Sequence, residues 1–312
     1  RILPHIEGMD SKCTNLFGII VVPVADDMQV HESHGFHCAA YGADVAAVFG
    51  TAQDDGTLKF FHKLIVREQA CYVNIPGVLS GMDLPFSDKT ALIVGASSGI
   101  GLTVARSLQQ AGARIRGVGR HAVAGMDMTL LNLDEKESCE KVLEMAAGCD
   151  ILVVVRGPFF QETLDHTPSG MWESLVYANL VFPGQLVSAA LPGMCRKEWG
   201  RILLFGGTRT DRVRGFRTNA AYAAAKTGLS SLILSTAQGY ASRGITCNGI
   251  CPGFVDSGAY TTEKRRSLEQ KSPLSKLVDE GEIVSAAEFL LKNPSINGTI
   301  VRVDQGWSPS FI

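Results

Sequence analysis

Tyr222 and Lys226 are the residues of this 312-residue chain whose types and spacing most directly suggest chemistry. They form a Tyr-x-x-x-Lys pattern in an alanine-rich stretch. Residues four apart lie on one face of a helix, so the ammonium would lower the pKa of the phenol from its unperturbed value of about 10. Such a phenol can act as an acid or a base near neutral pH. The alternative is an ordinary surface pair on a helix.

A glycine-rich segment at residues 95–101, GASSGIG, is the second feature with a chemical use. It follows an apolar run at 90–94 and precedes a helical pattern that extends to Gly112. Glycines at such a junction let the backbone approach a pyrophosphate, and the helix N-terminus presents free N–H groups and a positive dipole to it. The segment therefore predicts nucleotide binding, unless it is merely a turn in a glycine-rich chain.

The elements that must position these residues alternate along the chain from residue 89 onward. Apolar runs predict strands at 90–94, 114–118, 126–131, 151–155, 201–205, 245–250 and 299–303. Helical patterns separate them, with further ones at 135–147, 171–194 and 220–242. This alternation with short connections predicts an α/β fold, a doubly wound parallel sheet of the Rossmann type.

The first 85 residues have a different character. They carry 5 Lys and Arg against 10 Asp and Glu, whereas residues 86–312 carry 24 against 21. β-rich runs occur at 15–24, 45–51, 58–66 and 71–75, and residues 54–56 have the composition of a hairpin turn. We expect a small β-rich N-terminal extension of unknown role at 1–85 and a dinucleotide-binding domain at 86–312. Met9 is a candidate native start, which would make residues 1–8 tag-derived.

Composition excludes several classes of protein. The net charge of −2 lacks the basic excess of a nucleic-acid binder. The longest apolar run, residues 16–25, has about half the length that a bilayer span needs, and no secretory signal pattern opens the chain. The 8 cysteines form no CxxC pair and are interpreted as small buried residues in a reducing compartment. We therefore expect a cytoplasmic protein without nucleic-acid or membrane partners.

The glycine turn, the later Tyr-x-x-x-Lys helix and Pro252-Gly253 after the next strand together resemble the short-chain dehydrogenase/reductase family. The resemblance covers about residues 86–312, and the general layout is similar to that of oxoacyl-carrier reductases. It implies NADPH-dependent reduction of a ketone, with Tyr222 as the proton donor. It also implies that Lys226 holds the nicotinamide ribose and assists Tyr222, and that Asn179 positions a water in a proton relay.

The same resemblance implies the residues that contact the cofactor. They are Gly95, Ser97, Ser98, Gly99, Ile100, Gly101, Arg120, Gly157, Lys226, Pro252 and Gly253. Cofactor choice depends on the end of the second strand, where Gly119 precedes Arg120. An acidic residue there would accept the ribose 2′-OH of NADH, whereas Arg120 suits the 2′-phosphate of NADPH. The alternative is that Arg120 simply faces the solvent.

The chain departs from the family pattern at the catalytic serine, whose expected position is Gly207. The segment from there to the tyrosine is also about two residues longer than usual, so Thr208 or Thr210 could supply the missing hydroxyl. If neither does, the substrate carbonyl loses a hydrogen-bond donor, which costs on the order of 100-fold in rate.

Two further departures concern the cofactor cleft. Val94 stands where the family usually has threonine, and VVRG at residues 154–157 replaces Asn-Asn-Ala-Gly. The cleft therefore loses polar groups and gains the guanidinium of Arg156.

The extended segment is rich in arginine. It contains Arg209, Arg212, Arg214 and Arg217. Together with Arg156 they would suit a carboxylate, a phosphate or a carrier-bound substrate. The alternatives are a solvated loop that pairs with Asp211 and nearby acids, or a contact with the acidic extension or a neighbouring subunit.

A second cluster, in the extension, contains His31, His34, His37 and Cys38. These residues are possible zinc ligands, but the glycine and serine around them favour a flexible exposed turn, and we predict no metal.

Two other functions remain open. One is a nucleotide-binding protein with little or no reductase activity that acts in regulation or assembly, which Gly207 and the extension motivate. The other is an enzyme that runs as an alcohol dehydrogenase. In either case the resemblance implies a homodimer or homotetramer, assembled through the two long helices.

Overall fold

The structure is a computed structural model that describes residues 84–256 and 260–307 in full, and the strand backbones between residues 15 and 71. The chain divides into two compact units, Arg1–Met82 and Asp83–Ile312. Each unit is described by itself.

The first unit contains a five-stranded antiparallel sheet in the order β3-β4-β5-β6-β7 and a separate pair, β1-β2. The strands are β1 (Asn15–Leu16), β2 (Ile19–Ile20), β3 (Met28–Ser33), β4 (Phe36–Tyr41), β5 (Val45–Asp54), β6 (Thr57–Val66) and β7 (Gln69–Cys71). Asp54 pairs with Thr57, which agrees with a hairpin turn at this point of the sequence.

The flexible turn expected around the histidine cluster is wrong. His31 lies on β3 opposite Cys38 of β4, and Glu32 lies opposite His37. Two residues, His-Gly, join these strands in the sequence, and a glycine-containing link of this length is typical of a tight hairpin. His34 itself lies outside the described residues.

The second unit is built on a seven-stranded parallel sheet in the order β10-β9-β8-β11-β12-β13-β14. The strands are β8 (Thr90–Val94), β9 (Arg114–Gly119), β10 (Asp127–Leu130), β11 (Ile151–Val154), β12 (Gly200–Phe205), β13 (Ile245–Pro252) and β14 (Ile300–Val303). Successive strands add in one direction from β8 to β10 and in the other from β11 to β14. The chain order thus reverses between β8 and β11, and the predicted doubly wound fold is confirmed.

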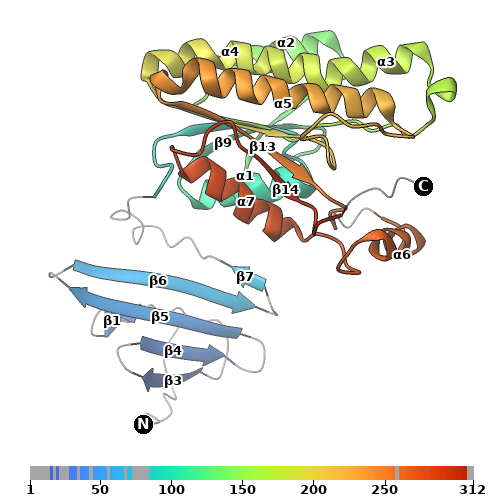
Figure 1. Cartoon of the computed structure of the whole chain (residues 1–312). Helices are drawn as coiled ribbons and strands as arrows, with labels where there is room; N and C mark the ends of the chain where they lie inside the picture. The colour runs from blue at the N-terminus through green and yellow to red at the C-terminus, as the bar shows by residue number, and fades with distance from the viewer. Residues whose placement is uncertain are drawn as a thin grey trace. The chain divides into compact units, whose positions relative to one another are not determined.

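Helices cover both faces of this sheet (Figure 1). They are α1 (Gly99–Gln110), α2 (Lys136–Ala146), α3 (Ser169–Val176), α4 (Phe182–Lys197), α5 (Ala220–Tyr240), α6 (Thr262–Lys271) and α7 (Glu280–Lys292), with a π-helical turn, η2 (Tyr177–Val181), between α3 and α4. Figure 1 shows α2, α4 and α5 over one face and α1 and α7 over the other.

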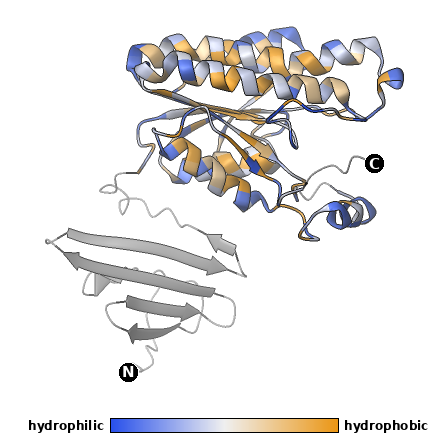
Figure 2. Ribbon diagram, in the orientation of Figure 1, coloured by the Kyte–Doolittle hydropathy of each residue, from blue (hydrophilic) through white to orange (hydrophobic). Residues whose placement is uncertain are grey.

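Two apolar clusters hold these layers together, one on each face of the sheet. Leu204 of β12 belongs to the cluster beneath α4 and α5, and Leu203, the next residue, belongs to the cluster beneath α1 and α7. Successive side chains of a strand point to opposite faces, so a strand covered on both sides needs a continuous apolar sequence. This requirement explains the apolar residues 202–205 of β12 and the burial of every residue of β11. Figure 2 shows the apolar residues concentrated along the sheet and α6 as largely hydrophilic.

Two helices were missed from the sequence, α6 and α7. Helix α7 carried a readable signal, because Asp279 and Glu282 form a capping box at its start. Its buried residues Ile283, Ala287 and Leu290 also follow helical spacing.

Among the described residues, one helical run, Ser169–Lys197, is long and apolar enough to cross a membrane by length and composition alone. Half of its most apolar window is buried within the domain. A helix that covers the core of a globular domain meets the same criterion, and α4 lies in such a place.

Leu204 offers a test of the core, because its side chain is fully buried between β12 and the helices. Leu204→Ala should lower the free energy of unfolding by about 2–5 kcal/mol through lost burial and the cavity left behind. Urea denaturation of the full chain measures the change. Leu274→Ala is the matched control, since Leu274 is 60% exposed and its truncation should cost little. Equal shifts in the two variants would contradict the described core.

Candidate active site

The glycine turn between β8 and α1 folds back on itself. A Cβ on Gly101 would lie 1.9 Å from the carbonyl oxygen of Gly95, and Gly95 itself has a φ of +100°. Both positions therefore require glycine. The first turn of α1 carries no acidic residue, and the Ser98 side chain makes no capping hydrogen bond. The positive end of α1 is thus left available to an anion.

The end of β9 lies against this turn. A Cβ on Gly119 would stand 2.7 Å from both Cβ and Oγ of Ser97. A side chain at position 119 would have to displace the turn, so an acidic residue does not fit there without rearrangement. Arg120, the next residue, is exposed.

Lys226 is buried in the first half of α5, 2% exposed, and its ammonium donates a hydrogen bond to the carbonyl of Phe205 at 2.7 Å. Burial lowers the pKa of Lys226 to about 8; Cys251 opposes this shift and the Arg156 guanidinium adds to it. Tyr222, one turn earlier, is half-buried. Burial raises the pKa of its hydroxyl, and Cys251 acts in the same direction, so the predicted lowering of this pKa by Lys226 is wrong.

Asn179 lies on the π-helical turn η2, and its amide nitrogen is fully used. Nδ2 donates to the carbonyls of Pro158 at 3.0 Å and Leu175 at 3.1 Å. Its Oδ1 is buried and has no hydrogen-bond partner among the described residues. Buried polar atoms are normally satisfied by protein or by water, so this oxygen calls for a partner.

Gly157, just after β11, brings Asn179 and Lys226 together. A Cβ on Gly157 would lie 2.9 Å from Nζ of Lys226 and 3.0 Å from Oδ1 of Asn179. A side chain at this position would occupy the space between the ammonium and the orphaned oxygen. Three residues far apart in the sequence therefore meet at one point, as the resemblance implies.

Gly207 lies directly against Tyr222. A Cβ there would stand 2.8 Å from Cε1 and 2.9 Å from the hydroxyl oxygen of the tyrosine. The ring of Phe159 packs edge-on against the ring of Tyr222, and the centroids of the two rings are 5.0 Å apart. The position expected for the catalytic serine thus adjoins the phenol, but even a methyl group is too close for the ring as it stands.

Both threonine hydroxyls of the following loop already form hydrogen bonds with the backbone. Thr208 Oγ1 donates to the carbonyl of Pro252 at 2.9 Å. Thr210 is buried, and its hydroxyl accepts from the amide of Gly207 at 2.8 Å and donates to that residue's carbonyl at 3.0 Å. The prediction that Thr208 acts on the substrate requires its hydroxyl to leave Pro252.

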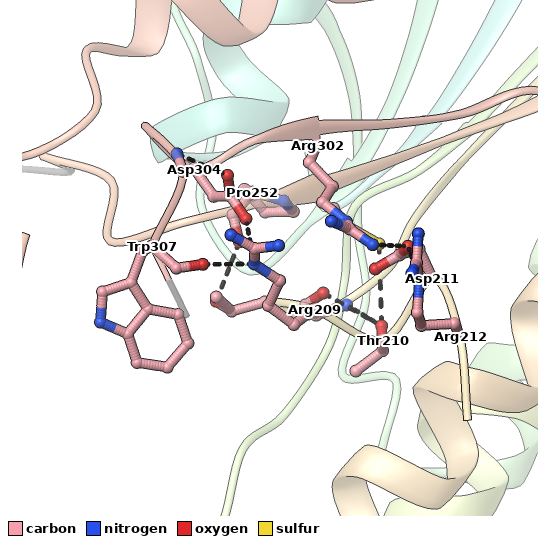
Figure 3. Close-up of polar contacts among 12 residues, drawn as sticks. Arg209, Thr210, Asp211, Arg212, Pro252, Arg302, Asp304 and Trp307 are labelled. Carbon is pink, nitrogen blue, oxygen red and sulfur yellow. Dashed lines mark hydrogen bonds and ion pairs between the residues drawn. The ribbon is translucent and has the colours of Figure 1, made fainter. Parts of the chain in front are cut away.

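Ion pairs fasten this loop to the end of β14 (Figure 3). Arg209 Nε lies 2.8 Å from Asp304 Oδ2, and it also donates to the carbonyl of Trp307. Asp211 pairs with Arg302 and with Arg212. The backbone of Arg209 has a φ of +61°, a conformation that is unusual for a residue other than glycine or asparagine. We name these contacts of Arg209, Asp211, Arg302 and Asp304 the loop clamp.

The arginines of the loop therefore have different surroundings. Arg209 is 14% exposed and held by Asp304, which is 5% exposed. Arg212 is 74% exposed beside Asp211, and Arg217 is exposed. Burial is the largest single influence on the pKa of Asp211 and raises it, but the hydrogen bond and charge of Arg302, with the hydrogen bonds from the backbone and from Arg212, together lower it.

Several residues near the site were missed from the sequence. Asp304 and Arg302 hold the loop, and Phe159 packs on the tyrosine. Phe159 had a signal, because it follows an apolar strand at the switch point. The pairing of the charged residues had none, since their partners lie almost a hundred positions away.

Comparison with known proteins identifies the family. A family model described as enoyl-(acyl carrier protein) reductase matches residues 95–308. A solved structure titled short chain dehydrogenase/reductase family protein is 26% identical, with a TM-score of 0.63 over 71% of this chain and 98% of that one. The chain belongs to the short-chain dehydrogenase/reductase family.

Curated relatives of this short-chain dehydrogenase/reductase are oxidoreductases. The D-beta-hydroxybutyrate dehydrogenase of Rhizobium meliloti is 30% identical and aligns over 70% of this chain and 98% of its own length. The 3-oxoacyl-(acyl-carrier-protein) reductase FabG of Escherichia coli is 32% identical over 71% and 98%, and that of Vibrio cholerae is 34% identical over 70% and 96%. The chain is an oxidoreductase of this family, and the predicted family is confirmed.

The loop clamp generates a stability prediction. Arg209→Ala leaves the buried Asp304 carboxylate without its cation, which should lower the free energy of unfolding by about 3–5 kcal/mol. Arg212→Ala removes a largely exposed pair and should cost less than about 1 kcal/mol. Urea denaturation at neutral pH measures both. A small effect for Arg209→Ala would show that the clamp does not stabilise the loop.

Proposed function

We propose that this protein reduces a ketone with NADPH, and that Tyr222 gives the proton to the forming alkoxide. The observation that carries the proposal is the convergence of Lys226 and Asn179 on Gly157, with Tyr222 one helical turn from the lysine. The buried ammonium and the orphaned amide oxygen are explained together if a ribose and a water occupy this space. A purely structural role leaves Asn179 Oδ1 unsatisfied.

The described residues fit a nicotinamide dinucleotide. The turn at residues 95–101 is a cradle that a Cβ would fill, and the free end of α1 suits the pyrophosphate. We assign the pyrophosphate to Gly95, Ser97, Ser98, Gly99, Ile100 and Gly101, the nicotinamide ribose to Gly157 and Lys226, and the carboxamide side to Pro252 and Gly253. When bound, the nicotinamide supplies the hydride.

The chain's own residues then handle the proton. Burial keeps the Tyr222 hydroxyl protonated, as a donor requires. We assign to the charge of Lys226, one helical turn away, the stabilisation of the phenolate that forms when the proton leaves. A water held by Asn179 Oδ1 and reached by Lys226 can return a proton to the tyrosine.

NADPH is proposed over NADH because position 119 has no room for an acid. Gly119 packs on Ser97, so the usual acceptor for a ribose 2′-OH is absent, and the exposed Arg120 beside it suits a 2′-phosphate.

The substrate class is proposed from charge and from relatives. Curated relatives are named for a 3-oxoacyl group on a carrier protein and for a small hydroxy acid, and Arg212 and Arg217 are exposed on the loop that follows Gly207. We propose an anionic or carrier-bound ketone as substrate, in a cytoplasmic homodimer or homotetramer.

A second candidate function is nucleotide binding without catalysis. Gly207 supplies no hydroxyl, and Thr208 and Thr210 both bond to the backbone. These observations favour a nucleotide-binding protein with little or no reductase activity that acts in regulation or assembly. Calorimetric binding of NADPH without turnover of any of a panel of ketones would select this alternative.

The proposed chemistry predicts a pH profile. The rate of ketone reduction at saturating NADPH should fall above about pH 8, because Lys226 loses its proton there. Tyr222→Phe should lower the rate by about 100-fold or more, since a general acid contributes 10²–10⁴-fold, while leaving NADPH affinity nearly unchanged. Equal rates in wild type and Tyr222→Phe would remove the tyrosine from the mechanism. A profile that is flat from pH 7 to 9 would remove the lysine.

Gly207 provides a second test of the site. Gly207→Ala places a methyl group 2.8–2.9 Å from the edge of Tyr222, and the ring cannot retreat freely because Phe159 packs on it. The rate should therefore fall by about tenfold, while the affinity for NADPH stays unchanged. Gly206→Ala, next to it but against Cys251 and Thr210, is the control for damage to the loop. A Gly207→Ala variant with full activity would show that Tyr222 need not occupy its present position.

A further inference from the structure

Arg156 follows β11 at the point where the strand order of the sheet reverses. Its backbone lies against the glycine turn: a Cβ on Gly95 would stand 3.0 Å from the amide nitrogen of Arg156, and that nitrogen donates to Val94 at 3.1 Å. Dinucleotides bind outside the carboxyl ends of the strands at such a reversal. Arg156 therefore borders the groove that the proposed function assigns to the cofactor.

The guanidinium of Arg156 is paired with Asp134, in the segment between β10 and α2. In the sheet, β9 and β8 lie between β10 and β11. The ion pair thus joins the segment after β10 to the segment after β11. It crosses the end of β8, the strand that the glycine turn follows. A side chain in this position lies where the adenosine half of a dinucleotide must enter.

The two partners differ in burial. The Arg156 side chain is 18% exposed, whereas that of Asp134 is 78% exposed. An exposed carboxylate is well hydrated without its partner, so Asp134 loses little when the pair separates, whereas the largely buried guanidinium needs another anion in its place. A phosphate group matches the guanidinium fork as a carboxylate does, and a 2′-phosphate or a whole pyrophosphate carries about two negative charges where the carboxylate carries one.

We propose that Arg156 binds a phosphate of the dinucleotide, and that Asp134 is its partner only until that phosphate arrives. This inference rests on the proposed nucleotide binding and adds a residue and an exchange of partners to it. The shared chemistry is an anionic phosphoryl group, which in this cofactor belongs either to the adenosine 2′-phosphate or to the pyrophosphate bridge. In the family pattern an alanine stands at this position, so the contact is a property of this chain.

The experiment measures dissociation constants of NADPH and NADH for the full chain by titration calorimetry. Arg156→Ala should weaken binding by about tenfold or more, as expected for a lost charge-assisted hydrogen bond. Asp134→Asn should strengthen binding by about threefold, because it removes the competing carboxylate. Glu135→Gln is the matched control, since it removes the neighbouring charge, which bonds to Asn132 and Ser138 rather than to Arg156.

A double-mutant cycle separates exchange from general electrostatics. In the Arg156→Ala background, Asp134→Asn should no longer strengthen binding. Loss of affinity for both nucleotides assigns the pyrophosphate to Arg156, and loss for NADPH alone assigns the 2′-phosphate. Should Arg156→Ala fail to fold, as judged by its melting curve, Arg156→Lys carries the test with a smaller loss.

Unchanged affinity of Arg156→Ala for both nucleotides would overturn the inference while leaving the proposed function intact. Weaker binding by Asp134→Asn would overturn it too, because the carboxylate would then assist the nucleotide. A wild-type protein that binds neither nucleotide is a separate result, which defeats the proposed function and this inference with it.

Discussion

The hydrogen bond from the Lys226 ammonium to the carbonyl of Phe205 is the contact on which the site depends. A buried charge is costly unless it is satisfied, so this bond fixes α5 against the end of β12. Fixing the helix also fixes Tyr222 one turn earlier and sets the space that Gly157 must leave open. The orphaned oxygen of Asn179 faces the same space, because the π-helical turn presents it there. One ammonium thus aligns groups from three separate segments.

Gly207 changes the part of the site that lies beside Tyr222. The resemblance places a serine there, whose hydroxyl would contact both substrate and tyrosine; in this chain the tyrosine ring occupies that space. The loop that follows is held to β14 by ion pairs. Arg209 keeps a left-handed backbone conformation within this clamp. A conformation of this kind persists where surrounding contacts determine it, and Asp304 and Trp307 provide them.

The sequence predicted the sheet well because a parallel sheet covered on both faces leaves a strong local pattern. Apolar residues make up β11, residues 91–94 of β8 and residues 202–205 of β12, and the bounds of these strands agree with prediction to within one or two residues. Tyr222 and Lys226 were accessible because their spacing alone puts them on one helix face. The strands that carry His31 and His37 were missed because glycine and serine beside histidines are also typical of a loop. The ion-pair partners and the burial of the arginines could not be predicted from the sequence, since Asp304 lies far along the chain from Arg209.

Burial, rather than charge count, separates the roles of these arginines. Arg209 and Asp304 are both nearly inaccessible, so neither can exchange its partner without stranding a charge in the interior, and their pair is structural. Arg156 is paired with a carboxylate that water can solvate, so that pair can exchange when a better anion arrives. A sequence that reads as one cluster of guanidiniums therefore contains a fixed element that shapes the wall beside the tyrosine and a replaceable one at the cofactor groove. The difference follows from where each acid lies, and only the folded chain determines that.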